Sequence, residues 1–104
     1  MQAYIYKAAL HCQDCAIKIK HQLHKTGNIP ADIPNEYSYD SDDYPKGPYS
    51  EGGGKSDCPN HCDTCGVFLE NPLTSDGELY VIEAVKSGDG CCIDEWKEYY
   101  SYLF

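Results

Sequence analysis

The sequence predicts a small α+β domain with a short N-terminal strand, two or three helices and a long irregular acidic loop. Two Cys-x-x-Cys pairs, Cys12/Cys15 and Cys62/Cys65, lie within 104 residues. A Pro- and Gly-rich acidic stretch separates the pairs, and apolar residues recur at helical spacing after the first pair and near the C-terminus. We treat residues 1–104 as a single domain, since a chain of this length supports one domain.

The first elements predicted are a strand and a helix that meet at the first cysteine pair. Residues 3–10 are rich in Tyr and Ile, which favours a strand that runs directly into this pair. A helix is predicted at about 15–26, with Asp14 as its N-cap and Gly27 as the residue that ends it. The residues at helical spacing are Ala16, Ile19, Lys20 and Leu23, with Ile17 widening the apolar stripe.

Residues 28–60 form the long acidic loop, because five prolines and the run Gly52–Gly54 interrupt both helix and strand. Loops longer than about 15 residues are uncommon in compact domains and are usually functional or disordered. Tyrosines argue against complete disorder here, since their rings can pack over the domain. These tyrosines are Tyr37, Tyr39, Tyr44 and Tyr49.

The C-terminal half predicts two helices after a short extended segment. Residues 67–69 are apolar and suit a strand or a packed extended segment. Residues 78–86 are ambiguous, but the spacing of Leu79, Ile82 and Val85, with Asp76 as a cap and Gly88 as terminator, favours a helix. Residues 92–103 predict an amphipathic helix. Its apolar face holds Ile93, Trp96, Tyr100 and Leu103.

The two cysteine pairs predict one structural zinc site with Cys12, Cys15, Cys62 and Cys65 as ligands. Each Cys-x-x-Cys pair lets two thiolates converge on one ion, and four thiolates leave no open position for water or substrate. Gly66 after the second pair suits a knuckle whose backbone turns with positive φ, and Cys15 falls in the first turn of the predicted helix. The parts are zinc-ribbon-like, with the helix pair placed first.

Other potential ligands remain as alternatives. Cys58 and His61 form a Cys-x-x-His pair beside Cys62, and either can replace one of the four cysteines; we favour Cys58 as a free thiol and His61 as a supporting or exposed residue. We expect His11 to pack or hydrogen-bond, and His21 and His24 to lie on a solvated helix face. Adjacent Cys91 and Cys92 do not suit disulfide geometry, so we expect one of them to face the core.

The sequence argues against enzymatic function. It contains no phosphate-binding loop, zinc-protease motif or nucleophile elbow; Gly52–Ser56 ends like a phosphate-binding loop but lacks the first glycine, the strand and the helix. A thioredoxin-like role needs a βαβ unit before the cysteine pair, and only eleven residues precede Cys12.

The net charge of the chain limits the kinds of partner that we expect it to bind. Seventeen Asp and Glu against eight Lys give a formal net charge of −9, which disfavours direct binding to nucleic acid or to anionic membranes and favours a basic protein surface. The N-terminus lacks a secretory signal, and an 18-residue apolar run is absent, so we expect a cytoplasmic protein.

Two family resemblances bear on function. Residues 10–16, followed by Ile19 and Leu23, resemble the metal-binding stretch of heavy-metal-associated domains, which implies a copper-chaperone-like role for Cys12 and Cys15 as an alternative. Residues 39–48, 52–54 and 61–77 resemble small proteins from phage and environmental sequences. That resemblance covers most of the chain, implies a viral or microbial origin and offers no known activity. Cys58 is outside its pattern.

Overall fold

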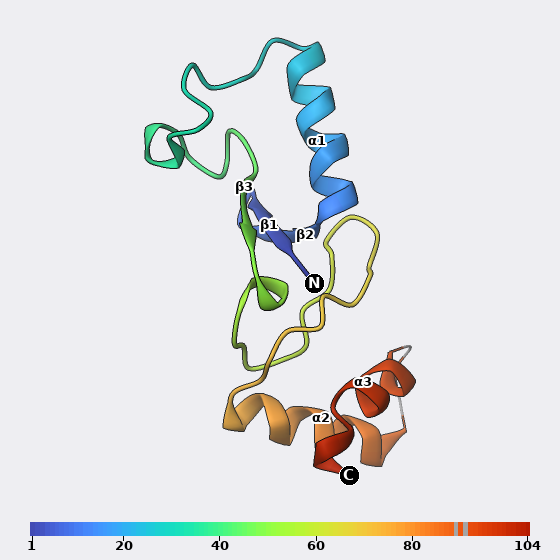
Figure 1. Ribbon diagram of the computed structural model, residues 1–104. Coiled ribbons are helices and arrows are strands. Elements are labelled where there is room, and N and C mark those ends of the chain that lie inside the picture. Colours follow the sequence, from blue (N-terminus) through green and yellow to red (C-terminus); the bar gives the residue numbers. More distant parts are fainter. Residues whose placement is uncertain (89, 91) are drawn as a thin grey trace.

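The computed structural model describes residues 1–88, 90 and 92–104, and it confirms the α+β class. A three-stranded sheet and α1 form one end of an elongated molecule of 49 × 23 × 17 Å, and α2 with α3 forms the other (Figure 1). The regular elements are β1 (Ala3–Tyr6), β2 (Ala9–Cys12), α1 (Gln13–Lys25), β3 (Lys46–Tyr49), α2 (Ser75–Ser87) and α3 (Ile93–Tyr99). Three 3-10 turns accompany them: η1 (Glu36–Ser38), η2 (Glu51–Gly53) and η3 (Ser101–Leu103).

The predicted single strand at 3–10 is wrong, because the chain reverses within it. β1 and β2 form an antiparallel hairpin in which Ala3 pairs with Cys12 and Tyr6 with Ala9. Lys7 and Ala8 make the turn with φ of 50° and 60°. Residues other than Gly, Asn and Asp rarely adopt this conformation, so the sequence carries no recognisable hairpin signal.

The loop at 28–60 is not wholly irregular, because it contains β3. This strand pairs antiparallel with β1 and forms one edge of a sheet with the order β2-β1-β3. An edge strand tolerates Pro48, which has no amide to donate. The four tyrosines of this segment differ in burial: Tyr44 is buried and Tyr39 is half-buried, while Tyr37 and Tyr49 are exposed.

The first two predicted helices are confirmed, with shifted boundaries. α1 begins at Gln13, so Cys12 is its N-cap rather than the predicted Asp14, which lies in the first turn. Gly27 follows the helix with a φ of 75°. α2 is a helix as expected, with Thr74 rather than Asp76 as its N-cap and Gly88 as its C-cap. Its buried face differs from the predicted stripe: Val81 is fully buried, whereas Leu79 is 59% exposed.

The C-terminal helix is shorter than predicted. α3 ends at Tyr99, and the chain continues as η3 after a break at Tyr100. Tyr100 is 1% exposed and its hydroxyl donates a hydrogen bond to the backbone oxygen of Asn71. Trp96, Tyr100 and Leu103 still share one apolar cluster, as the periodicity predicted.

Two buried clusters meet at one extended segment. Ala3, Cys15, Cys62 and Leu69 form the first cluster; Phe68, Leu73, Val81 and Tyr100 form the second. Consecutive side chains of an extended chain point in opposite directions. Phe68 and Leu69 therefore enter different clusters, and this segment joins the sheet end of the molecule to the helical end.

Gly52 provides a test of this packing. Its amide donates to the Met1 oxygen over 2.6 Å, its φ is 61°, and an added Cβ would overlap the backbone oxygen of Leu69. We expect Gly52→Ala to lower the free energy of unfolding by about 3 kcal/mol. The control is Gly27→Ala, at a φ of 75° with open space around the added Cβ, which should cost about 1 kcal/mol. Urea denaturation measures both, and equal losses would contradict the packing argument.

Candidate metal centre

Four sulfur atoms from two distant parts of the chain converge on one site. The Sγ atoms of Cys12, Cys15, Cys62 and Cys65 all lie within 4.8 Å of one another, and those of Cys12 and Cys65 are 3.7 Å apart. A tetrahedron with bonds of about 2.3 Å from ion to sulfur has edges of about 3.8 Å. The four cysteines can therefore hold a metal ion after sub-ångström adjustments.

The first pair is positioned by the start of α1. Cys12 is the N-cap residue, and Cys15 lies in the first turn, where free backbone amides and the helix dipole favour negative charge. Burial nevertheless raises the pKa of the Cys15 thiol to about 12, with neighbouring sulfurs contributing in the same direction. Burial also raises the pKa of Cys12. Both thiols thus keep their protons near neutral pH unless a cation replaces them.

The second pair lies on a tight knuckle, as predicted. The Gly66 amide donates to the Cys62 oxygen over 2.8 Å, and Gly66 has a φ of 79°. Burial would raise the pKa of Cys62, but hydrogen bonds from the backbone amides of Cys65, Cys12 and Thr64 outweigh it and lower the pKa to about 6. Cys62 is therefore the sulfur best prepared to be a thiolate.

Direct hydrogen bonds connect the knuckle, residues 62–66, to β2. The Asp63 amide donates to the Leu10 oxygen over 2.8 Å. His11, which is 5% exposed, shares a hydrogen bond of 3.0 Å between its Nδ1 and the Thr64 hydroxyl. These contacts hold the two cysteine pairs close together, and an ion bound by all four sulfurs would strengthen the same connection. His11 packs and hydrogen-bonds, as its position in the sequence suggested.

His61 supports the knuckle from outside the sulfur cluster. Its Nε2 accepts a hydrogen bond of 3.1 Å from the Trp96 indole, and its Nδ1 lies 2.9 Å from the Gly66 oxygen. Because Nε2 accepts, Nδ1 must carry the proton and donate to Gly66. Both ring nitrogens are thereby used, and the imidazole links the knuckle to α3. This link was not predicted; the only sequence signal was the position of His61 beside Cys62.

The remaining residues singled out from the sequence lie elsewhere. Cys58 is exposed and outside the cluster. His21 is exposed, and His24 is exposed with its Nε2 3.0 Å from the Tyr44 hydroxyl. Cys92 is half-buried, and the expectation for Cys91 concerns a residue outside the described ones.

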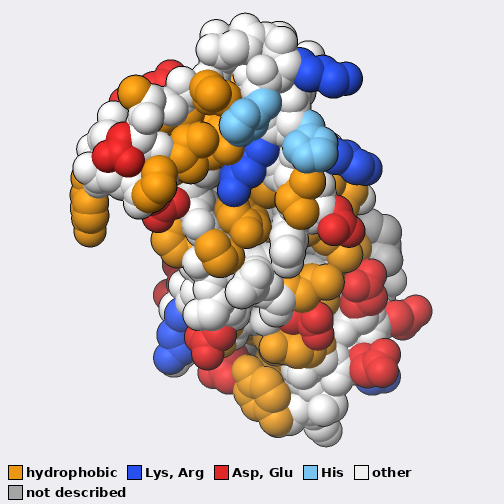
Figure 2. Space-filling model, turned by 45° about the horizontal axis from the view of Figure 1, so that its top comes forward, with side chains coloured by type: hydrophobic (Ala, Val, Ile, Leu, Met, Phe, Trp, Pro, Cys, Tyr) orange, Lys and Arg blue, Asp and Glu red, His pale blue; other side chains and the backbone are white. Residues whose placement is uncertain are grey.

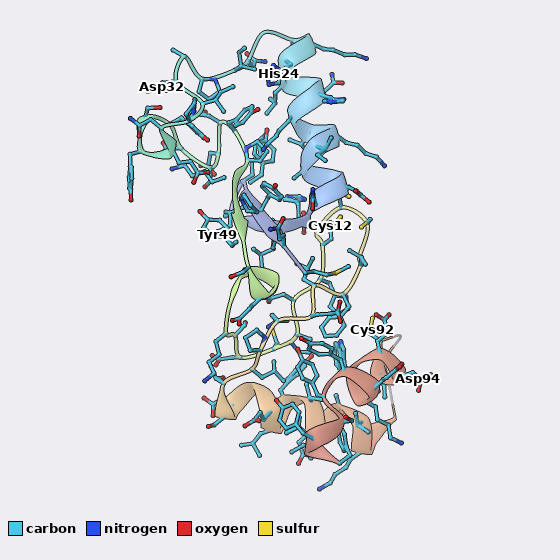
Figure 3. The ribbon with its side chains drawn as sticks, viewed as in Figure 1. Cys12, His24, Asp32, Tyr49, Cys92 and Asp94 are labelled. Atoms are coloured by element: carbon cyan, nitrogen blue, oxygen red, sulfur yellow. The ribbon has the colours of Figure 1, made fainter. Side chains whose placement is uncertain are left out.

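Access to the sulfurs is uneven. Cys15 and Cys62 are buried, Cys12 is half-buried and Cys65 is exposed. Figure 3 places Cys12 where the start of α1 meets the loop that carries the second pair. A cavity of about 480 Å³ opens on this side, lined by Cys12, Cys15, Cys65 and Met1 among others. One face of the centre is therefore packed into the core and the other faces solvent.

Comparison of the chain with protein-family models, curated proteins and solved structures finds no match. Within the described ranges, the helices are too short or too polar to cross a bilayer.

Metal binding should release protons. Cys12 and Cys15 have raised pKa values, so an ion that binds four thiolates near pH 7.5 must displace at least their two protons. The affinity should accordingly rise with pH. Calorimetry of Zn²⁺ binding in buffers of different ionisation enthalpy measures the number released, and a value clearly below two would contradict coordination by all four sulfurs.

Proposed function

We propose that this chain is a structural zinc protein that acts as a non-enzymatic protein-interaction module. The observation that carries the proposal is that four sulfurs converge from two segments of the chain, with 46 residues between Cys15 and Cys62. A tetrathiolate donor set is typical of structural zinc, which fills its coordination sphere with protein ligands. The residues fit such an ion by donor type and by the spacing of their sulfurs.

The role we assign to zinc is to clamp the hairpin and α1 to the central knuckle. Residues 28–60 lie between the two cysteine pairs, so an ion held by both pairs closes this segment into a loop. Closing a loop lowers the conformational entropy of the unfolded chain and favours the folded state. The ion would then order the acidic segment rather than perform chemistry.

The interaction role is supported by the distribution of charge. Residues 28–60 carry seven acidic side chains against two lysines, and residues 75–104 again carry seven against two. Such surfaces attract basic proteins and repel phosphate backbones. A basic protein surface is therefore the partner we propose, and a phage or microbial origin, suggested by the sequence resemblance alone, would suit a small inhibitor or adaptor.

Metal handling is the second candidate, and one observation favours it. Cys12 and Cys65 line the open cavity and are not buried, so an incoming thiol can approach their sulfurs from solvent. Metal-transfer sites need such access, and soft thiolates bind Cu(I) well. The buried Cys62 and the all-cysteine set favour the structural role.

Removing one buried sulfur should abolish the site. We expect Cys62→Ser to lose the bound metal and to lower the thermal midpoint by at least about 10 °C, since a four-cysteine site rarely retains zinc with three thiolates. Elemental analysis and circular dichroism are the measurements. Cys58→Ser makes the same chemical change at an exposed cysteine outside the cluster and should alter neither quantity. Retention of one metal per chain by Cys62→Ser would refute the assignment.

Metal exchange separates the two candidate functions. Protein purified without added metal should contain one zinc per chain, and removal of the ion should unfold the sheet end of the molecule as monitored by circular dichroism. A mild chelator at low excess should leave structural zinc in place. Rapid loss of the ion without loss of structure, together with preferred binding of Cu(I), would instead support metal handling.

A further inference from the structure

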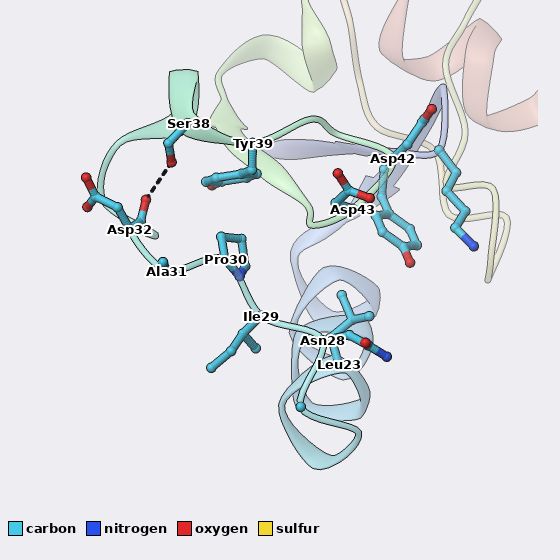
Figure 4. Close-up of a pocket in the computed structure, with 13 residues that line it drawn as sticks. Leu23, Asn28, Ile29, Pro30, Ala31, Asp32, Ser38, Tyr39, Asp42 and Asp43 are labelled. Atoms are coloured by element: carbon cyan, nitrogen blue, oxygen red, sulfur yellow. Dashed lines mark hydrogen bonds between the residues drawn. The ribbon is translucent and has the colours of Figure 1, made fainter.

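An open cavity lies at the end of the molecule farthest from α2 and α3. It has a volume of about 650 Å³ and lies between the C-terminal end of α1, the turn between β1 and β2, and the first part of the acidic loop (Figure 4). That volume is typical of ligand pockets. Its apolar wall is formed by Leu23, Ile29, Pro30 and Tyr39, and carboxylates are added by Asp32, Asp42 and Asp43.

Backbone hydrogen bonds hold the walls of this cavity in place. The Lys7 amide donates to the Ser41 oxygen over 3.0 Å and joins the hairpin turn to the loop. The Asn28 amide donates to the backbone oxygen of Leu23 over 2.9 Å. The Ser38 hydroxyl donates to the backbone oxygen of Asp32 over 3.0 Å. Because the walls are ordered in advance, a ligand loses less free energy in arranging them.

The residues that line the cavity carry more negative than positive charge. Among the described residues that line it, Lys7 is the one cation, and its Nζ lies 5.4 Å from the centre of the Tyr6 ring rather than against a carboxylate. Figure 4 shows Asp43 on one side of the hollow and Pro30 and Tyr39 on the other. Figure 2 shows this end of the molecule, where hydrophobic side chains gather beside acidic ones. An anionic ligand is therefore disfavoured here.

We propose that this cavity binds a lysine or arginine side chain of a basic protein segment. The aliphatic stem of either residue can pack against Pro30 and Tyr39 while its charged head reaches Asp43. A purely apolar side chain would cover that carboxylate without pairing it, which costs free energy. The inference rests on the proposed interaction function and deepens it, since it names the place on the acidic surface where a basic partner is recognised.

The test uses the full-length, metal-loaded protein and a fluorescent hexa-arginine peptide. Fluorescence anisotropy at low and high salt measures affinity, and amide NMR shifts locate the site. We expect shifts concentrated in residues 28–43 and salt-sensitive binding that Asp43→Asn weakens about fivefold. Glu83→Gln removes the same charge from an exposed position on α2 and should change the affinity less than twofold. Ala31→Trp, which adds a large side chain to the lining of the cavity without changing charge, should weaken binding more than fivefold.

Four outcomes would overturn the proposal, and they separate it from the broader function. If Glu83→Gln weakens binding as much as Asp43→Asn, or if Ala31→Trp has no effect, attraction is spread over the acidic surface; the cavity is then not the site, although an interaction with basic partners stands. Shifts centred on α2 and α3 lead to the same conclusion. Absence of salt-sensitive binding in the unmodified protein would remove both the cavity and the proposed basic partner.

Discussion

The structure depends on the approach of the Cys62 knuckle to the start of α1. This contact brings together residues separated by 46 positions and is held by the Asp63–Leu10 backbone bond and by the His11–Thr64 bond. A cross-link that closes a loop of this length is worth about 4 kcal/mol in the chain-entropy model. For a small protein whose stability is typically about 5–15 kcal/mol, an ion at this point can decide whether the sheet end is folded.

A short buried segment connects this contact to the helical end of the molecule. Leu69 packs beside Cys62, and Phe68 packs against Val81 and Tyr100. Asn71, which is fully buried, accepts a hydrogen bond from the Asn60 amide over 2.6 Å and donates to the Cys58 oxygen over 3.1 Å. Its own backbone oxygen accepts from the Tyr100 hydroxyl. One polar side chain and its backbone thus connect the segment before the knuckle to the C-terminal helices, and the buried side-chain polar atoms of Asn71 all have partners.

Charge is distributed unevenly along the molecule, which matters for recognition. The hairpin and α1 region, residues 1–27, holds four lysines and one aspartate, whereas the remaining chain is strongly acidic. Figure 2 shows the histidine side chains gathered with several lysines in its upper part, while acidic side chains predominate in its lower part. The proposed cavity lies at the border between these regions, so a basic partner would meet both attraction and an orienting repulsion.

The sequence by itself determined the cysteine pairs, the positions of the three helices and the knuckle glycine, because each depends on local spacing or on a glycine with positive φ. Only the tertiary structure decided how the pieces meet. The β1–β2 turn at Lys7 and Ala8 uses a left-handed conformation that neither residue signals, and β3 exists because an edge position beside β1 accepts Pro48. The choice of Val81 over Leu79 as the buried residue of α2, and the role of His61 between Gly66 and Trp96, likewise follow from long-range packing. Such contacts join residues too far apart in the chain for periodicity to reveal.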